Sequence, residues 1–154
     1  MKSELSRIRS TADYQFGKGT GIKLFPEGVE ITYSKATGRI RYVHLNGKRL
    51  ATLRPTDGLL SLSIAAAKLI TENHGSAKCF VTVQNAVSEF IAKGGDVFAF
   101  HVVTVDDEVH SKDEVIILDE NHQVLAVGRA LLSALEMKTF KKGVAVKVRR
   151  GCAN

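Results

Sequence analysis

The stretch EMKTFKKGVAVKVRRG, residues 136–151, combines a strand's worth of valine with six lysines and arginines, and no acid follows Glu136 in the chain. Side chains alternate along a strand, so the valines of VAVKVR are expected on one face, with Ala145, Lys147 and Arg149 on the other. A buried valine face would fix the strand against a core and hold its cations at a set spacing. The stretch therefore predicts a folded basic edge, not a frayed basic tail.

A short helix is expected just before this strand. SALE, residues 133–136, has the pattern of a capping box, in which Ser133 and Glu136 satisfy each other's backbone N–H groups. Gly143 is expected to close the helix. Three further cations then lie at the helix end and in its turn: Lys138, Lys141 and Lys142.

The region upstream of this helix has the pattern of short strands. We expect strands over residues 79–83, 97–105, 113–119 and 124–130, and a helix over 85–95 that ends at Gly94-Gly95. Asn85 is the expected N-cap of that helix, with Phe90 on its buried face. Gly128 inside a strand indicates a bulge or a close backbone approach. Many short strands with two short helices favour a small, partly open β-barrel.

The first half of the chain has a different pattern. Strands are expected over residues 28–34, 39–45 and 48–54, and Asn46-Gly47 is a strong signal for a two-residue hairpin turn. Residues 58–75 have helical spacing, with the apolar stripe running from Leu59 and Leu62 to Ile70. The polar segment NHGSAK, residues 73–78, is the best linker candidate. The fold class is therefore α+β, with an α+β domain over 1–75 and a barrel domain over 76–154.

Charge is distributed unevenly along the 154 residues, whose formal net charge is +6. Residues 1–77 contain twelve lysines and arginines against six acids, whereas 78–154 contain ten of each. Within the second half, residues 106–120 hold seven acids and one lysine, while 138–150 hold six cations and no acid. A basic face of this kind suits a polyanionic ligand. Solvated charge that only keeps the protein soluble is the alternative.

Several classes of function lack support in the sequence. No apolar run is long enough for a membrane span, and the N-terminus has no secretory signal, so a cytoplasmic protein is expected. Cys79 and Cys152 read as free thiols. The five histidines have no metal-site spacing, and we expect no metal and no cofactor. GKGTG, residues 17–21, lacks the context of a phosphate loop and is expected to be a flexible connection.

Two long stretches resemble a known family. KGGDVFAFHVV at 93–103 and KDEVIILDENHQVLAVGRALLSALEMKTFKKGVAVKVRRG at 112–151 resemble the PUA domain, an RNA-binding module named after pseudouridine synthases and archaeosine transglycosylases. The similarity is greatest to the PUA domain that ends archaeal tRNA-guanine transglycosylases. Residues 16–70 are similar to the small domain that precedes PUA in those enzymes. The resemblance does not extend to their large catalytic barrel, so no catalytic activity is expected.

The resemblance implies a groove for RNA between the first helix, its glycine loop, the next strand and the last strand. Carried over residue by residue, it selects Lys93, Gly94, Gly95, Asp96, Val97, Phe98, Lys147, Arg149 and Arg150. Glycines let backbone N–H groups approach phosphates, and lysine and arginine neutralise them. The helix-end cations Lys138, Lys141 and Lys142 are second-tier candidates. Gly94-Gly95 would also serve as a plain helix stop, and Phe98 as a core residue instead of a base-stacking platform.

The expected function is RNA binding, with tRNA or another structured RNA as ligand. Such a protein would dock or position RNA for modification or translation, alongside a separate modifying enzyme. Two alternatives stay open: a non-catalytic subunit of a split tRNA-guanine transglycosylase, and an interaction module for an acidic protein.

Overall fold

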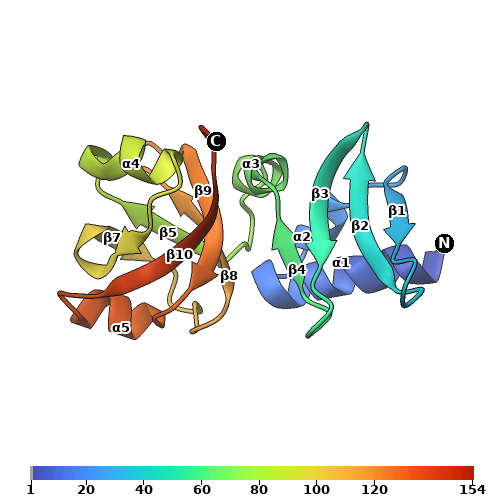
Figure 1. Ribbon diagram of the computed structural model, residues 1–154, viewed down its shortest axis with the longest axis horizontal. Helices are drawn as coiled ribbons and strands as arrows, with labels where there is room; N and C mark the ends of the chain where they lie inside the picture. The colour runs from blue at the N-terminus through green and yellow to red at the C-terminus, as the bar shows by residue number, and fades with distance from the viewer. Residues whose placement is uncertain (1) are drawn as a thin grey trace. The chain divides into compact units, whose positions relative to one another are not determined.

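The protein, seen in a computed structural model that describes residues 2–154, divides into two compact units. The first ends at Ala77 and the second is Lys78–Asn154. The first contains a four-stranded sheet in the order β1-β2-β3-β4, and the second a six-stranded sheet in the order β6-β10-β9-β8-β5-β7 (Figure 1). The predicted α+β class with a barrel-like second sheet is confirmed.

The first unit contains three helices and four strands among its described residues: α1 (Lys2–Phe16), α2 (Thr20–Leu24), β1 (Glu30–Tyr33), β2 (Ile40–Leu45), β3 (Lys48–Leu53), β4 (Leu60–Leu62) and α3 (Ile64–Glu72). The strands form an antiparallel meander. The Asn46-Gly47 turn is confirmed, since both residues have positive φ, 52° and 79°, between the paired Leu45 and Lys48.

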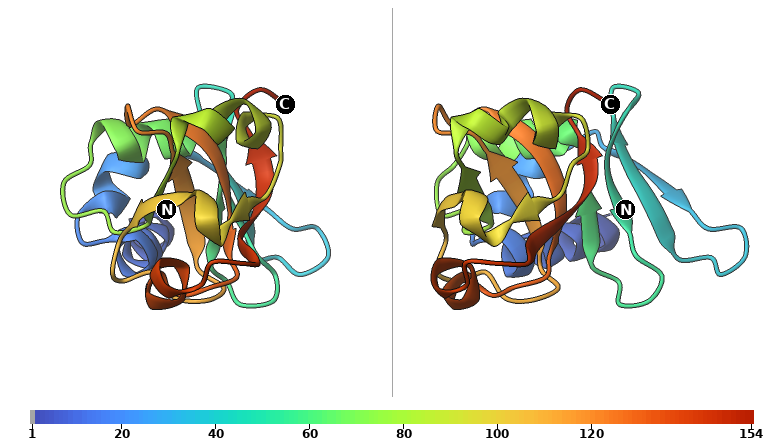
Figure 2. Two further views of the ribbon diagram at one scale, coloured as in Figure 1. Left: turned by 90° about the vertical axis from the view of Figure 1, so that its left-hand side faces the viewer. Right: turned by 60° about the vertical axis from the view of Figure 1, so that its left-hand side comes forward.

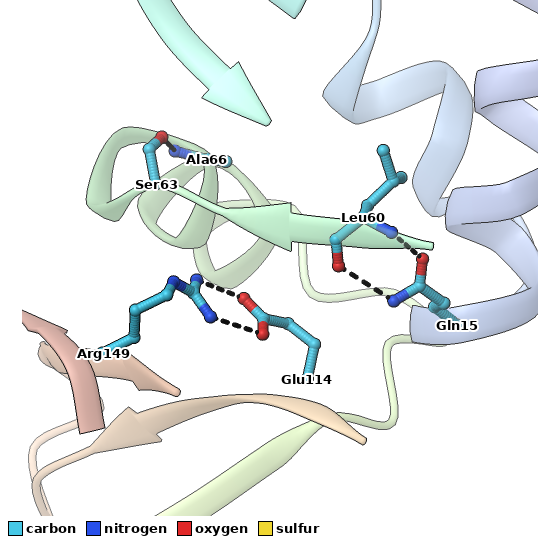
Figure 3. Close-up of polar contacts among 6 residues, drawn as sticks. All are labelled: Gln15, Leu60, Ser63, Ala66, Glu114 and Arg149. Carbon is cyan, nitrogen blue, oxygen red and sulfur yellow. Dashed lines mark hydrogen bonds and ion pairs between the residues drawn. The ribbon is translucent and has the colours of Figure 1, made fainter. Parts of the chain in front are cut away.

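Helix α1 is the element that the sequence pattern did not reveal. It buries Ile8, Ala12 and Phe16, which recur every four residues on one face. The Gln15 side chain fixes it to the sheet, because its Oε1 accepts from Leu60 N at 2.6 Å and its Nε2 donates to Leu60 O at 3.1 Å (Figure 3). Figure 1 shows α1 crossing the direction of the strands.

The glycine-rich segment 17–21 is not a connection throughout, because its last two residues belong to a helix. Gly17 and Gly19 have positive φ, and α2 begins directly after them at Thr20. A Cβ at Gly21 would lie 2.2 Å from Arg9 O, so the missing side chain lets α2 approach the backbone of α1. Gly21 N also donates to Asp13 Oδ1 at 2.7 Å.

The expected helix over 58–75 begins later than its apolar spacing indicated. Residues 60–62 form β4, and Ser63 caps α3 by accepting a hydrogen bond from Ala66 N at 3.1 Å (Figure 3). Leu60 and Leu62 are buried because alternate residues of β4 face the same side. Pairing with β3 therefore outweighs the helical spacing that runs through this segment.

The second unit contains six strands and four short helical segments among its described residues: β5 (Phe80–Val83), η1 (Asn85–Val87), α4 (Ser88–Ala92), β6 (Val97–Phe98), η2 (Ala99–His101), β7 (Val102–Val105), β8 (Glu114–Leu118), β9 (Val124–Ala130), α5 (Ala134–Thr139) and β10 (Val144–Gly151). Strand β5 pairs in parallel with β8, and the other pairings are antiparallel. Figure 2 shows α4 and α5 at opposite ends of the barrel, with β10 running between them.

Two expectations for this unit need correction. The strand expected over 97–105 is interrupted by η2, where the His101 ring accepts a hydrogen bond from Phe98 N at 3.2 Å. The helix expected over 85–95 is a 3₁₀ turn followed by α4, and Asn85 does not cap it. Asn85 instead exchanges two hydrogen bonds with Glu120, and Phe90 is 52% exposed instead of buried.

The predicted helix after Ser133 is confirmed, capping box included. Ser133 Oγ accepts from Glu136 N at 3.2 Å, and Glu136 Oε1 accepts from Ser133 N at 2.9 Å. The close approach at Gly128 is also confirmed, since a Cβ there would lie 2.3 Å from Lys147 O on the neighbouring strand. The core of this unit gathers aliphatic residues from β5, β8, β9 and β10, with Ile91 and Met137 contributed by the two helices.

Candidate nucleic-acid interface

Strand β10 is folded into the sheet between β6 and β9, so the predicted folded segment is confirmed but it is not a sheet edge, and its cations are exposed. Lys147, Arg149 and Arg150 face solvent, while Val146 and Val148 are buried. The expected position of Ala145 on the solvent side is wrong, because Ala145 is fully buried. The register of β10 against β6 shifts between Val144 and Val146, and this irregularity breaks the simple alternation.

The glycine loop and β10 lie together, although some fifty residues separate them in the chain. Strand β6, directly after the loop, pairs with β10 so that Phe98 faces Val144. Asp96 Oδ1 accepts a hydrogen bond from Val148 N at 2.9 Å, and Asp96 Oδ2 lies 3.5 Å from Lys147 Nζ. The structure thus brings together the two segments that the resemblance selected, and Asp96 links the strand to the loop.

Gly94 and Gly95 are needed for different reasons, one for its backbone conformation and the other for the space that it leaves. Gly94 has φ 104°, a conformation that only glycine adopts at low cost. A Cβ at Gly95 would lie 2.4 Å from the Phe90 ring, so Gly95 leaves space for that half-exposed aromatic side chain. The chain end also lies beside this loop, since Ala153 N donates to Ala92 O at 2.9 Å. The loop is therefore well defined and carries Lys93 at its start.

Arg149 is committed to a carboxylate inside the protein. Its Nη1 and Nη2 donate to Glu114 Oε1 and Oε2 at 2.7 and 2.5 Å, a bidentate pair drawn in Figure 3. The Glu114 side chain is completely buried and that of Arg149 is 40% exposed. A buried carboxylate needs such a partner, because an isolated buried charge is strongly disfavoured. We therefore assign Arg149 first to the fold.

Arg129 is an exposed cation beside this pair that the sequence analysis did not select. It pairs across the sheet with Lys147 on one side and with Glu114 on the other. Residues directly opposite in neighbouring strands share a face of the sheet. VLAVGRA does not alternate, since its first five residues are apolar and buried, and only the strand order places Arg129 next to Lys147.

A second basic region lies at the other end of the unit. A cavity of about 290 Å³ is lined by Phe100, Val103, Met137, Phe140 and two of the second-tier cations, Lys138 and Lys141, among others. Lys138 forms an ion pair with Asp107, and that hydrogen bond lowers the pKa of the Asp107 carboxyl. Lys141 and Lys142 are exposed. These cations are separate from the glycine loop along the chain and lie on different elements.

Phe98 occupies an intermediate position between the core and the surface. Its neighbour Val97 is fully buried, while Phe98 is half-buried and stacks on Phe100 with ring centroids 6.1 Å apart. Phe100 is 60% exposed, so it is the better placed of the two rings to meet a nucleobase. The sequence analysis did not select Phe100, because alternation in the expected strand puts it on the same face as Phe98, which was interpreted as a core residue.

Other chemistry finds little support. The described residues contain no cluster of three or more potential metal-ligating side chains. Among residues 2–154 no helix is long and apolar enough to cross a membrane. Both cysteines are free thiols, and burial raises the pKa of Cys79 far above its usual value, which leaves the thiol unreactive in the folded state. Burial also lowers the pKa of His101, which favours its neutral form.

Comparison with protein families matches nearly the whole chain in two parts. Residues 6–75 match the patch-forming domain C2 of tRNA-guanine transglycosylase, and residues 80–152 match the PUA domain. The tRNA-guanine(15) transglycosylase of Pyrococcus furiosus is 46% identical over 144 residues, which cover 94% of this chain and 24% of that enzyme. The chain thus spans about a quarter of the length of this curated relative.

Solved structures confirm the fold over the entire chain. A hypothetical protein from Pyrococcus horikoshii superposes with a TM-score of 0.79 at 24% identity, covering 100% of this chain and 93% of that one. A PUA-domain protein from Thermoplasma acidophilum superposes with a TM-score of 0.74 at 23% identity, covering 100% and 92%. At these identities the likeness concerns the arrangement of the chain alone.

Proposed function

This chain joins a patch-forming C2 domain of the tRNA-guanine transglycosylase type to a PUA domain, and on that premise we propose that it binds structured RNA, with tRNA as the expected ligand. The relatives that match the chain along most of its length are tRNA-guanine(15) transglycosylases, which supports tRNA over other RNAs. The expected compartment is the cytoplasm, and no catalytic role is proposed for this chain.

The observation that carries the proposal is the meeting of the glycine loop with β10. The loop supplies Lys93 and the side-chain-free Gly94, and the strand supplies the exposed Lys147 and Arg150. Asp96 ties the two together through Val148 N at 2.9 Å. Cations at a fixed spacing are suited to successive phosphates of an RNA strand. The N–H groups of Gly94 and Gly95 already donate to Ile91 O at 2.9 Å and to Phe90 O at 3.0 Å, so the cations carry the proposed contacts.

The residues selected for RNA binding then divide by role. We propose that Lys93, Gly94, Gly95, Lys147 and Arg150 contact the RNA, with Arg129 at the edge of the same surface. Asp96, Val97, Phe98 and Arg149 hold the loop and strand in place through the contacts described above. Lys138, Lys141 and Lys142 remain second-tier, since they belong to the region around Phe100. The protein would act by positioning RNA for a modifying enzyme or for translation.

Filter-binding titrations of a tRNA at several salt concentrations test the proposal. Lys147→Ala with Arg150→Ala leaves the Arg149–Glu114 pair intact and is expected to weaken binding. Because two ion contacts are lost, the slope of log affinity against log salt should flatten by about two. Lys78→Ala with Lys112→Ala removes the same charge from exposed positions outside the loop and β10 and serves as the control. An unchanged slope, or equal loss in both variants, would refute the assignment.

A second candidate is a non-catalytic subunit of a split tRNA-guanine transglycosylase. It is favoured by one observation: 94% of the chain aligns with only 24% of the Pyrococcus furiosus enzyme. Pull-down from cells with identification of the bound species separates the candidates. RNA alone supports the positioning role, and RNA with a transglycosylase-like chain supports the subunit. An acidic protein without RNA would support the third possibility, a protein-interaction module, and would contradict both.

A further inference from the structure

The first unit contains a cavity that the proposed RNA surface does not use. Its volume is about 330 Å³, and it is lined by residues of α1, of the segment 34–41 and of the turn after β3. Four arginines are among the lining residues: Arg7, Arg39, Arg41 and Arg54. We propose that this cavity binds the phosphate monoester of a nucleotide, either free or at the 5′ end of an RNA.

The charges around the cavity do not cancel. None of the described residues that line it is acidic. Asp57 lies 3.4 Å from Arg54 Nε, and the Glu4 carboxylate accepts a hydrogen bond from the Tyr33 hydroxyl. The lining itself thus carries four guanidinium groups and no carboxylate.

Arg54 contributes a buried donor that has an ion-pair partner but no hydrogen bond in the protein. Its Nε is buried and makes no hydrogen bond, and its side chain is only 13% exposed. The Asp57 carboxylate lies 3.4 Å away, at ion-pair distance but without hydrogen-bond geometry. The turn holds Arg54 there, because Arg54 N donates to Leu59 O at 2.8 Å and Gly58 N to Arg54 O at 2.9 Å. An anionic oxygen in the cavity would satisfy the kind of buried donor that proteins rarely leave unpaired.

The residue types select a phosphate monoester among anions. Guanidinium groups match phosphate and carboxylate oxygens, but several of them around one cavity favour a group with close to two negative charges. A monoester has three terminal oxygens and one attached sugar. An internal phosphodiester has one charge and would bring chain into the cavity on both sides. The buried Ile8 and Ile40 and the nearby Leu53 provide an apolar wall for the sugar or base.

Calorimetric titration of the full chain with AMP and with adenosine tests the phosphate requirement. AMP is expected to bind and adenosine to bind at least about tenfold more weakly, because charge-assisted hydrogen bonds to the phosphate are lost. Arg7→Ala with Arg39→Ala should reduce AMP affinity by a similar factor. Lys18→Ala with Lys48→Ala removes equal charge from exposed positions of the same unit outside the cavity lining and should leave AMP affinity unchanged.

Equal affinity for AMP and adenosine, or equal affinity of the Arg7/Arg39 variant and the unmodified protein for AMP, would overturn the site. Competition then identifies the natural source. A 5′-phosphorylated RNA oligonucleotide that displaces AMP better than its 5′-hydroxyl counterpart identifies an RNA end, whereas equal displacement identifies a free nucleotide. Because AMP is titrated without RNA, failure here leaves the proposed tRNA surface of the second unit untouched.

Discussion

Arg149 lies beside two other exposed cations of β10, yet its surroundings differ from theirs. Lys147 forms a largely exposed ion pair with Asp96 and Arg150 is exposed, whereas both Arg149 Nη atoms donate to the buried Glu114 carboxylate. Alternation predicts that a side chain at this position points away from the core. Alternation does not predict that the buried Glu114, two strands away, lies on the same face, because that depends on the order of β8, β9 and β10 in the sheet.

Arg149→Ala should therefore destabilise the protein far more than Lys147→Ala. The substitution removes the bidentate partner of a buried carboxylate, for which losses of about 3–5 kcal/mol are typical when both groups are buried. Since Arg149 is 40% exposed, we expect the lower end of that range. Urea unfolding monitored by circular dichroism measures the difference. Adding Glu114→Gln to Arg149→Ala should recover part of the lost stability, because the buried charge is then removed. Equal stability of Arg149→Ala and Lys147→Ala would contradict the assignment.

His101 makes the folding stability depend on pH. Burial lowers the pKa of His101 below its usual value of 6.5, so the unfolded chain binds a proton more readily than the folded one. The contribution of His101 to stability is thus constant above that value and is lost as the pH falls through it. Unfolding free energies from pH 8 to pH 5 should decline less in His101→Gln than in the unmodified protein. Parallel pH profiles would show that His101 does not titrate in this way.

At the scale of elements, the β9–β10 pairing holds the proposed surface in place. Gly128 permits it, because a Cβ there would lie 2.3 Å from Lys147 O and 2.9 Å from Val148 Cα. Both contacts are with backbone, which cannot move aside as a flexible side chain can. The tight approach and the cations of β10 are thus parts of one arrangement.

Gly128→Ala is expected to cost about 1–3 kcal/mol, as overpacking of a tight site does, and to weaken tRNA binding by displacing Lys147. Gly143→Ala is the comparison, since a Cβ at Gly143 meets no atom within 4 Å and only its positive φ opposes the change. Thermal melting and filter binding report the two effects. Equal stability of Gly128→Ala and the unmodified protein would contradict the claim that the close approach of β9 to β10 requires glycine here.

Elements with a local signal were predictable from the sequence, and those that depend on tertiary contacts were not. The Asn46-Gly47 turn and the Ser133–Glu136 capping box are each encoded within four residues, and both are confirmed. Helix α1 has a narrow apolar face of three residues, Ile8, Ala12 and Phe16, in an otherwise polar segment, which is a weak signal. Residues 60–62 form strand β4 and not a helix because they pair with β3. The 3₁₀ turn η2 depends on the bond between His101 and Phe98 N.

The site divides in the same way. The cations of β10 were identifiable by type and spacing and the glycine loop by its resemblance to the PUA domain, and the two segments lie together through β6 and Asp96. The pairing of Arg149 with Glu114 and the position of Arg129 follow from the strand order. The exposure of Phe100 follows from the interruption of the expected strand by η2. The arginine-lined cavity combines residues from 7 to 58, a set that no local motif reveals.

At the scale of the whole molecule, each unit has its own sheet and buried residues, so each should fold by itself. A fragment of residues 76–154 is expected to unfold cooperatively in urea. It should bind tRNA more weakly than the full chain, because the net charge of +6 carried by residues 1–77 is then absent. Filter binding at matched salt compares the two. Equal affinities would mean that the first unit takes no part in RNA binding.

The central claim is that RNA meets the protein at the glycine loop and the last strand. Amide chemical shifts recorded by nuclear magnetic resonance while tRNA is added test it residue by residue. The account predicts that the signals of Gly94, Gly95, Lys147 and Arg150 shift or broaden first, at RNA concentrations that leave the signals of β7 unchanged. It would be contradicted if those four signals stayed in place while others, such as those of Phe100 and Lys141, moved.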